Sequence, residues 1–308
     1  MLRWLPLFLL LLFPGTAVAG LKVAVSIRPV HSLVCSLMQG SGTPELVIAA
    51  AGSPHNYNLR PSEVRLLHQA DLMIWLGPEL ETVLSRPLAG RNAGSQTLEL
   101  LQELPERLIL TTREGGRWDN HHSEADPAHG HLDPHIWLSP TNAGAIATII
   151  AARLVELDAG NRDLYERNLA ALQARLDALA TLTATRLAPL QQRNYLVFHD
   201  AYQYFERDFG LRPVGALAVD PDRPPGARRL AEIKASIRSQ QIICLFTEPQ
   251  FEPRLVKVLA EGTDIRIGTL DPIGAELAPG KELYFDLITA MATALETCLA
   301  GKEQADGQ

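Results

Sequence analysis

Short apolar runs alternate along this chain with longer segments whose apolar residues recur at helical spacing. The short runs predict strands over residues 21–27, 45–49, 72–76, 97–100, 194–198, 211–218, 242–246 and 265–269. The longer segments predict helices over residues 29–39, 61–70, 78–88, 140–157, 201–209, 227–239, 253–261 and 281–299. Strands that alternate with helices form parallel sheets whose faces the helices cover. The pattern therefore predicts an α/β fold with two similar lobes, although no strict sequence repeat relates them.

A longer helical segment, residues 161–187, separates the two predicted lobes. No glycine or proline interrupts it, Asn161 is a candidate N-cap, and Pro189 follows its end. Its leucines recur close to helical spacing at Leu164, Leu169, Leu172, Leu176, Leu179 and Leu182. At ~1.5 Å per residue the helix would be roughly 40 Å long, which favours a rigid connector over the alternative of a helical hairpin. We expect a linker helix over residues 160–188 between an N-terminal lobe, 20–159, and a C-terminal lobe, 189–308.

The first 19 residues have the pattern of a secretory signal peptide. Arg3 supplies the positive charge, residues 5–13 form the apolar stretch, and Ala17-Val18-Ala19 fits a cleavage site. A membrane anchor is the alternative, but the apolar stretch is shorter than the ~20 residues that a spanning helix needs. We therefore expect cleavage after Ala19 and a soluble, exported mature protein.

Composition narrows the range of ligands. The chain has 308 residues, of which 46% are hydrophobic and 20% are charged, so it can bury a substantial core. Its formal net charge of -7 argues against nucleic acid as a partner, because binding a polyanion requires a basic face. Three cysteines are too few for a disulfide scaffold.

Three histidines occupy comparable places near predicted strand ends. His55 comes shortly after the strand predicted to end at residue 49, His199 directly follows an apolar strand, and His135 lies between a polar loop and a helix. Asp271 follows another predicted strand in the same way. Ligands of open α/β sheets bind beyond the carboxyl ends of the strands, and three imidazoles with one carboxylate suit tetrahedral Zn²⁺. Taken singly, each residue could equally be a turn or capping residue.

The segment 114–132 is polar, rich in glycine and histidine, and without periodicity, which predicts a loop. Within it, residues 119–131 carry three carboxylates and four histidines: His121, His122, His129 and His131. Histidine-rich tracts of this kind bind metal ions, so we expect a weak secondary metal site here. The alternative is a solvated loop with incidental histidines. We expect no metal-ligand role for two other histidines. His31 should be structural or support the site, and His68 should lie on a helix surface.

Several motifs together resemble one protein family. They are Ser-Pro-His-Asn-Tyr at 53–57, Trp-Leu-Gly-Pro-Glu at 75–79, Asp-Pro-His-Ile-Trp-Leu-Ser-Pro at 133–140, Phe-His-Asp-Ala-Tyr at 198–202, Thr-Glu-Pro-Gln at 247–250 and Thr-Leu-Asp-Pro-Ile-Gly at 269–274. In this order they resemble the periplasmic zinc-binding proteins of ABC importers, the ZnuA type of the cluster A-I solute-binding proteins. The resemblance spans nearly the whole mature chain, and the motifs are specific as a set rather than singly.

The resemblance implies two Rossmann-like α/β lobes joined by one long helix, with the metal in the cleft between them. It also implies His55, His135 and His199 as Zn²⁺ ligands, with Asp271, a water or another carboxylate as the fourth. A histidine rather than a carboxylate at position 199 favours zinc over manganese, whereas imidazole ligands do not separate zinc from copper. The implied partner is an inner-membrane ABC permease, and we expect a periplasmic monomer. The same resemblance implies a Cys244–Cys298 disulfide, which leaves Cys35 as a free, buried thiol.

A carrier and an enzyme remain the two main functional alternatives. A zinc hydrolase also uses three protein ligands, and it leaves the fourth position open for water. The sequence contains no His-Glu-x-x-His, Gly-x-Ser-x-Gly or P-loop motif. We therefore expect a zinc carrier rather than an enzyme. An exported zinc hydrolase, a manganese or copper carrier of the same fold, and an adhesion module are the alternatives.

Overall fold

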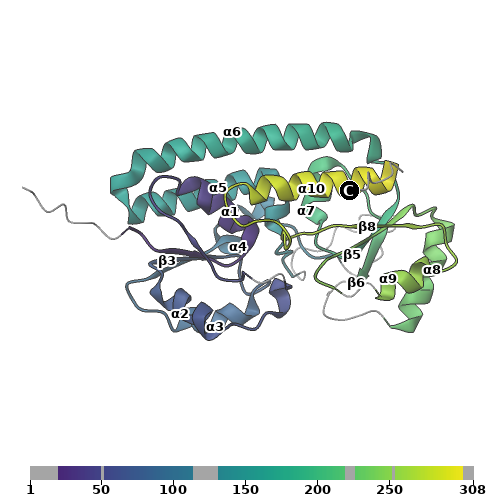
Figure 1. Ribbon diagram of the computed structural model, residues 1–308, viewed down its shortest axis with the longest axis horizontal. Helices are drawn as coiled ribbons and strands as arrows, with labels where there is room; N and C mark the ends of the chain where they lie inside the picture. Colours follow the sequence, from purple (N-terminus) through teal and green to yellow (C-terminus); the bar gives the residue numbers. More distant parts are fainter. Residues whose placement is uncertain (1–19, 50–51, 114–130, 219–225, 252–253, 301–308) are drawn as a thin grey trace, which may run out of the picture.

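A computed structural model describes residues 20–49, 52–113, 131–218, 226–251 and 254–300. It contains two parallel four-stranded sheets with helices packed around them, so the predicted α/β class is confirmed (Figure 1). The sheets lie in two lobes side by side, and the long helix α6 runs along both of them (Figure 1). Residues 1–19, and with them the expected signal peptide, lie outside the description.

The first sheet has the strand order β2-β1-β3-β4. Its strands are β1 (Val23–Val25), β2 (Glu45–Leu46), β3 (Leu72–Trp75) and β4 (Gln96–Glu99). Around it lie α1 (Arg28–Leu37), α2 (Pro61–Gln69), α3 (Ser85–Ala89), α4 (Leu100–Glu103) and α5 (Pro140–Leu157). Every residue of β1 and β3 is buried, because helices cover both faces of a parallel sheet.

The second sheet has the equivalent order, β6-β5-β7-β8. Its strands are β5 (Tyr195–His199), β6 (Gly215–Ala218), β7 (Cys244–Thr247) and β8 (Arg266–Thr269). Its helices are α7 (Gln203–Phe209), α8 (Ala227–Ser239), α9 (Arg254–Ala260) and α10 (Leu283–Ala300). In each lobe the first strand therefore pairs with both the second and the third, which confirms that the lobes are similar in topology.

The helix predicted over residues 78–88 is partly wrong. Residues 78–80 form a turn, and helical structure begins only with a 3₁₀ turn at Thr82–Leu84, followed by α3. The cause is Glu81, whose backbone is not helical and whose carboxylate accepts the N–H groups of Leu76 at 3.0 Å and Gly77 at 3.2 Å. This side chain folds back to cap the end of β3, and the helix cannot start before it.

The linker segment is one uninterrupted helix, α6 (Arg162–Leu187), rather than a hairpin. Its 26 residues give a length of about 39 Å at ~1.5 Å per residue. Its buried positions include Leu172, Leu176 and Leu179, as the leucine spacing predicts. The last leucine of the predicted series, Leu182, does not follow this pattern: it is 58% exposed, and its neighbour Thr183 is buried instead.

The C-terminal helix α10 connects the lobes a second time. It packs against α1 and α6 as well as β8. The backbone N–H of Tyr284 donates to Ser32 on α1, and its hydroxyl donates to the carbonyl of Trp137. A single hydrophobic core therefore runs from the first sheet to one face of the second, while the other face of the second sheet has a smaller core of its own. Among the described helices, α10 alone is long and apolar enough to cross a membrane, and half of it is buried in the protein.

The predicted disulfide is confirmed. Cys244 on β7 and Cys298 on α10 are bonded, with their Cα atoms 6.1 Å apart. Cys35 is free, as expected, but it is half-buried rather than fully buried. Its sulfur lies 3.6 Å from Nδ1 of His31, one turn earlier on α1.

Candidate metal centre

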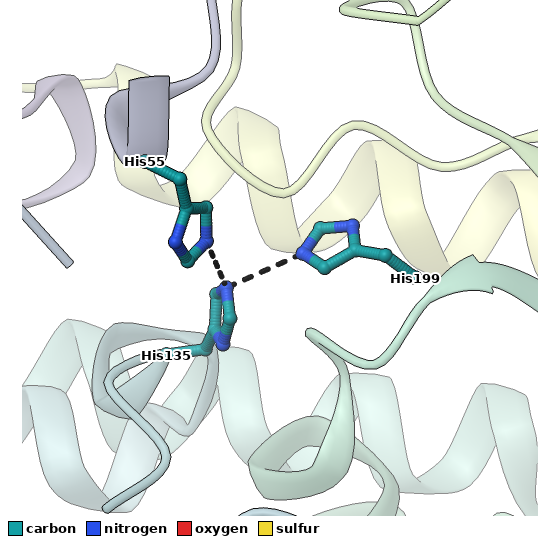
Figure 2. Close-up of side chains that lie close together, drawn as sticks. All are labelled: His55, His135 and His199. Carbon is teal, nitrogen blue, oxygen red and sulfur yellow. Dashed lines mark hydrogen bonds between the residues drawn. The ribbon is translucent and has the colours of Figure 1, made fainter. Parts of the chain in front are cut away.

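Three histidines from different parts of the chain meet between the lobes (Figure 2). His55 lies in a 3₁₀ turn (Pro54–Asn56) that follows β2, His135 immediately precedes another 3₁₀ turn (Ile136–Leu138), and His199 ends β5. One ring nitrogen from each lies within 4.8 Å of the others. The structure thus brings together the three histidines that the sequence singles out. It places His199 inside β5, whereas the sequence pattern predicts that this strand ends one residue earlier.

The separations between these rings fit the ligands of one zinc ion. Nε2 of His135 lies 3.2 Å from Nε2 of His55 and 3.4 Å from Nε2 of His199. Tetrahedral zinc with Zn–N bonds of ~2.0–2.1 Å requires ligand nitrogens about 3.3 Å apart. Two of the three separations in this triad therefore match edges of such a tetrahedron, and the third, between His55 and His199, is within 4.8 Å.

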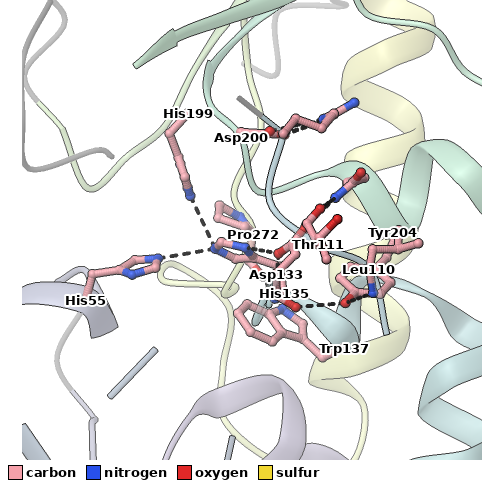
Figure 3. A network of polar contacts seen from close by, with 12 residues as sticks. His55, Leu110, Thr111, Asp133, His135, Trp137, His199, Asp200, Tyr204 and Pro272 are labelled. Atoms are coloured by element: carbon pink, nitrogen blue, oxygen red, sulfur yellow. Dashed lines mark hydrogen bonds and ion pairs between the residues drawn. The ribbon is translucent and has the colours of Figure 1, made fainter. Parts of the chain in front are cut away.

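Two buried carboxylates hold the rings of His135 and His199. Asp133 Oδ1 lies 2.8 Å from Nδ1 of His135 and also accepts its backbone N–H, as Figure 3 shows. Glu248 Oε1 lies 2.5 Å from Nδ1 of His199. A proton held on Nδ1 leaves the lone pair of Nε2 free for a metal, which is the usual carboxylate–histidine–zinc arrangement. Neither carboxylate stands out in the sequence, although Asp133 and Glu248 both lie inside motifs that resemble the zinc-binding family.

Burial and neighbouring charges shift the pKa values of His55 and His199 in opposite directions. Burial, followed by repulsion from His135 and His199, lowers the pKa of His55 to about 2. Burial also opposes charge on His199, but the Glu248 carboxylate outweighs it and the pKa of His199 is raised. The site thus attracts positive charge, yet three rings at these distances cannot all carry protons. A single shared cation resolves this conflict.

The three rings are held unequally. His135 and His199 are buried, whereas His55 is only partly buried. In the described part of the chain no carboxylate contacts the ring of His55; the hydroxyl of Ser53 caps the turn by accepting its backbone N–H. His55 therefore forms the open side of the site.

Ser53, Glu248 and Gln250 also line the cavity, and five apolar side chains form the remainder of its wall. They are Pro54, Trp137, Phe251, Pro272 and Ile273. Phe251 meets the ring of His199 edge to face, with centroids 6.1 Å apart, and stacks on Phe198. The indole N–H of Trp137 donates to the carbonyl of Pro272 at 2.7 Å, which joins the two lobes beside the site (Figure 3). An apolar wall of this kind excludes water and strengthens electrostatic interactions inside it.

Asp271, the expected fourth ligand, is engaged in its own turn. Its two carboxylate oxygens accept the backbone N–H groups of Ile273, Gly274 and Ala275 and the side-chain N–H of Gln250. It does not belong to the group of side chains whose ligand atoms lie within 4.8 Å of one another. Its role as a ligand stays a prediction.

The remaining histidines fall into three groups. His121, His122 and His129 of the predicted secondary site lie outside the described residues, and His131 is exposed at the root of that segment. His31 is buried with Nε2 3.0 Å from the carbonyl of Pro44, so it is structural. His68 is exposed on α2, as expected.

Known proteins match this chain over nearly its whole length. A family model described as the periplasmic component A of the zinc-uptake complex, ZnuA, matches residues 23–298. The chain is 39% identical to a high-affinity zinc uptake system protein ZnuA from Brucella suis, covering 94% of this chain and 95% of that protein. It is 37% identical to the protein of the same name from Yersinia pestis, covering 91% and 92%. A crystal structure of ZnuA superimposes with a TM-score of 0.77 at 27% identity, covering 91% of this chain and all of that one. With the zinc-spaced histidines at the junction of its lobes, this chain belongs to the ZnuA family of periplasmic zinc-uptake proteins.

Proposed function

We propose that this protein captures Zn²⁺ with His55, His135 and His199 and delivers it to an ABC-type importer. The observation that carries the proposal is the spacing of the three Nε2 atoms, 3.2 and 3.4 Å, with a carboxylate behind two of the rings. Zinc uptake is also what the names of the relatives describe.

The charges around the site support a divalent ion. Three neutral imidazoles do not balance the charge of Zn²⁺, and an unbalanced charge is costly in a buried site. Asp133 and Glu248 supply two negative charges directly behind His135 and His199, and their side chains are only 2% and 1% exposed. The ion and the two carboxylates together are neutral. This balance favours a divalent ion over a monovalent one.

A fourth ligand completes the tetrahedron, and we propose a water or a carboxylate there. Asp271 remains the candidate from the sequence, and it would first have to give up hydrogen bonds in its turn. A fourth ligand supplied by the protein would close the site and suit a carrier, because zinc enzymes leave the fourth position to water. Carriage is also the activity of this family, which binds and transports its solute.

The remaining expectations form part of the same proposal. The protein is exported with cleavage after Ala19, acts in the periplasm as a monomer made of lobes 20–159 and 189–308, and meets an inner-membrane permease. The histidine-rich segment binds further metal weakly, because its ligands are local and ordering them costs conformational entropy.

Metal competition tests the proposal. The purified mature protein, residues 20–308, is offered equal amounts of Zn²⁺, Mn²⁺ and Cu²⁺, and the tightly bound metal is counted after gel filtration. We expect one tight zinc per chain. A preference for manganese, or the absence of any tight metal, would contradict the proposal. Hydrolysis of ester or phosphate test substrates by the zinc-loaded protein would favour the enzyme instead.

A further inference from the structure

The root of the histidine-rich segment is a short two-stranded ribbon beside the metal centre. Thr111 pairs with Leu132 in an antiparallel bridge, and the N–H of Thr112 donates to the carbonyl of His131 at 2.8 Å. The N–H of Asp133 donates to the carbonyl of Leu110 at 2.8 Å. The ribbon therefore ends at Asp133, the residue that orients His135.

The ribbon rests on the first turn of α7 in the C-terminal lobe. The hydroxyl of Tyr204 accepts the N–H of Leu110 at 2.9 Å and donates to the carbonyl of Asp133 at 2.7 Å (Figure 3). The amide of Gln203 donates to the carbonyl of Thr111 and to Asp133 Oδ2, each at 3.0 Å. Helix α7 begins four residues after His199, so this contact links the chain before His135 to the chain after His199.

Arg113 adds ion pairs to this contact between the ribbon and the C-terminal lobe. Its guanidinium makes a bidentate pair with Asp200 and reaches Glu206 Oε2 at 2.9 Å. The side chains of Asp200 and Glu206 are only 6% and 4% exposed. Asp200 directly follows His199 in the chain, and Glu206 lies on α7. A residue of the ribbon thus holds both the backbone after one ligand and the helix that follows it.

We infer that Arg113 is a positioning residue for zinc: by holding Asp200 and Glu206 against the ribbon, it sets the separation of His199 from His135 that one ion requires. The inference rests on the proposed function, because it concerns the geometry of that same site. His135 is tied to the ribbon through Asp133, and His199 is tied to it through Asp200. Arg113 makes the charged contact that ties His199 to the ribbon. Its planar guanidinium can donate two hydrogen bonds to the carboxylate of Asp200, which the ammonium group of a lysine cannot do in the same geometry.

Two other roles for Arg113 predict different changes in zinc affinity when it is removed. If it were only a nearby positive charge, its removal would strengthen zinc binding, because like charges repel. If it only stabilised the fold, its removal would lower the unfolding temperature and leave zinc affinity unchanged. A positioning role alone predicts weaker zinc binding together with a changed coordination geometry.

The test compares Arg113→Ala and Arg113→Lys with Arg186→Ala in the mature protein. Arg186 is a matched control, because it makes a similar ion pair with Glu296 between α6 and α10, outside the site. Zinc affinity is measured by competition with a chelator, geometry by the visible absorption of bound Co²⁺, and stability by the unfolding temperature of the metal-free protein.

We expect Arg113→Ala to weaken zinc binding by about 10–100-fold, the range typical of residues that orient metal ligands, and to alter the Co²⁺ spectrum. Arg113→Lys should fall between it and the wild type, and Arg186→Ala should keep the wild-type affinity. Unchanged or tighter zinc binding in Arg113→Ala would overturn the inference. If that variant does not fold, Arg113→Lys decides by the same criteria. A wild-type protein that binds no zinc would instead overturn the proposed function.

Discussion

The two lobes have the same strand order but hold their metal ligands differently. The N-terminal lobe offers His55 from a partly buried turn and His135 from a buried turn outside its sheet. The C-terminal lobe offers His199 from the end of a central strand, with Glu248 behind it. Equivalent topology therefore does not produce equivalent sites. Ligands depend on the connections at the strand ends, and in this protein those connections differ.

The lobes also differ in how they are stabilised. The C-terminal lobe contains the Cys244–Cys298 disulfide, whereas the cysteine of the N-terminal lobe, Cys35, is free. Each lobe also buries a glutamate whose pKa burial raises to about 7. Glu206 in the C-terminal lobe pairs with Arg113, and Glu81 in the N-terminal lobe is held by backbone N–H groups. These contrasts lead to four predictions about the stability and zinc affinity of the two lobes.

The disulfide predicts the largest asymmetry in stability. Replacing both Cys244 and Cys298 by serine opens a loop of 54 residues and should lower the free energy of unfolding by about 4 kcal/mol on the chain-entropy model. Urea unfolding of the metal-free protein measures the loss. Cys35→Ser is the control and should change the midpoint little, because Cys35 is half-buried and unbonded. Equal losses in the two variants would remove this distinction between the lobes.

The buried Glu81 predicts a pH dependence of stability that originates in the N-terminal lobe. Burial raises the pKa of Glu81 from 4.5 to about 7, so the folded protein holds this proton more tightly than the unfolded chain does. Stability from this group is therefore present below pH 4.5 and is lost as the pH rises towards 7, by up to roughly 3 kcal/mol.

Glu81→Gln removes the titrating group and retains an oxygen that can accept the N–H groups of Leu76 and Gly77. Urea midpoints of the metal-free protein, measured from pH 4.5 to 8, should fall less steeply in this variant than in the wild type. Parallel profiles would show that Glu81 ionises equally in the folded and unfolded states.

Removing a ligand tests the contribution of each lobe to the site. His199→Ala should weaken zinc binding by about 100-fold or more, because the C-terminal lobe then loses its histidine from the site. This loss is at least as large as the upper end of the range for residues that orient metal ligands. His55→Ala should weaken zinc binding less, because His55 is the least buried of the three histidines and a water can replace it. Chelator competition measures both, with the exposed His68→Ala as the control. Equal effects of His199→Ala and His68→Ala would rule out the three-histidine site.

The two orienting carboxylates predict the smallest effect and a similar one in each lobe. Asp133→Asn and Glu248→Gln keep the size of the side chain and remove its charge, and each should weaken zinc binding by about 10–100-fold. The same chelator competition compares them, with Glu296→Gln as a matched control far from the histidines. A loss in only one of the two would mean that the lobes orient their ligands by different means.

The sequence by itself predicts most of the local structure. The predicted bounds of α5 and α8 match the structure at both ends, because each helix has a clear apolar period and a glycine, proline or capping residue near its start. The helix expected over 78–88 fails where Glu81 caps β3, a side-chain contact that has no periodic signature. Periodicity reports which face of an element is buried and says nothing of such caps.

In the metal centre, the three histidines can be predicted from the sequence, whereas the residues around them depend on how the chain folds. His55 and His199 stand in short motifs near strand ends, positions that parallel sheets bring together, and His135 stands in a motif just after the predicted loop. Glu248 is 49 residues from His199, and Asp200 and Arg113 are 87 residues apart, so no local pattern could pair them. Likewise, only the folded turn reveals that the oxygens of Asp271 accept neighbouring N–H groups. Ligand types are a property of the chain, whereas hydrogen-bond partners depend on the path of every loop between them.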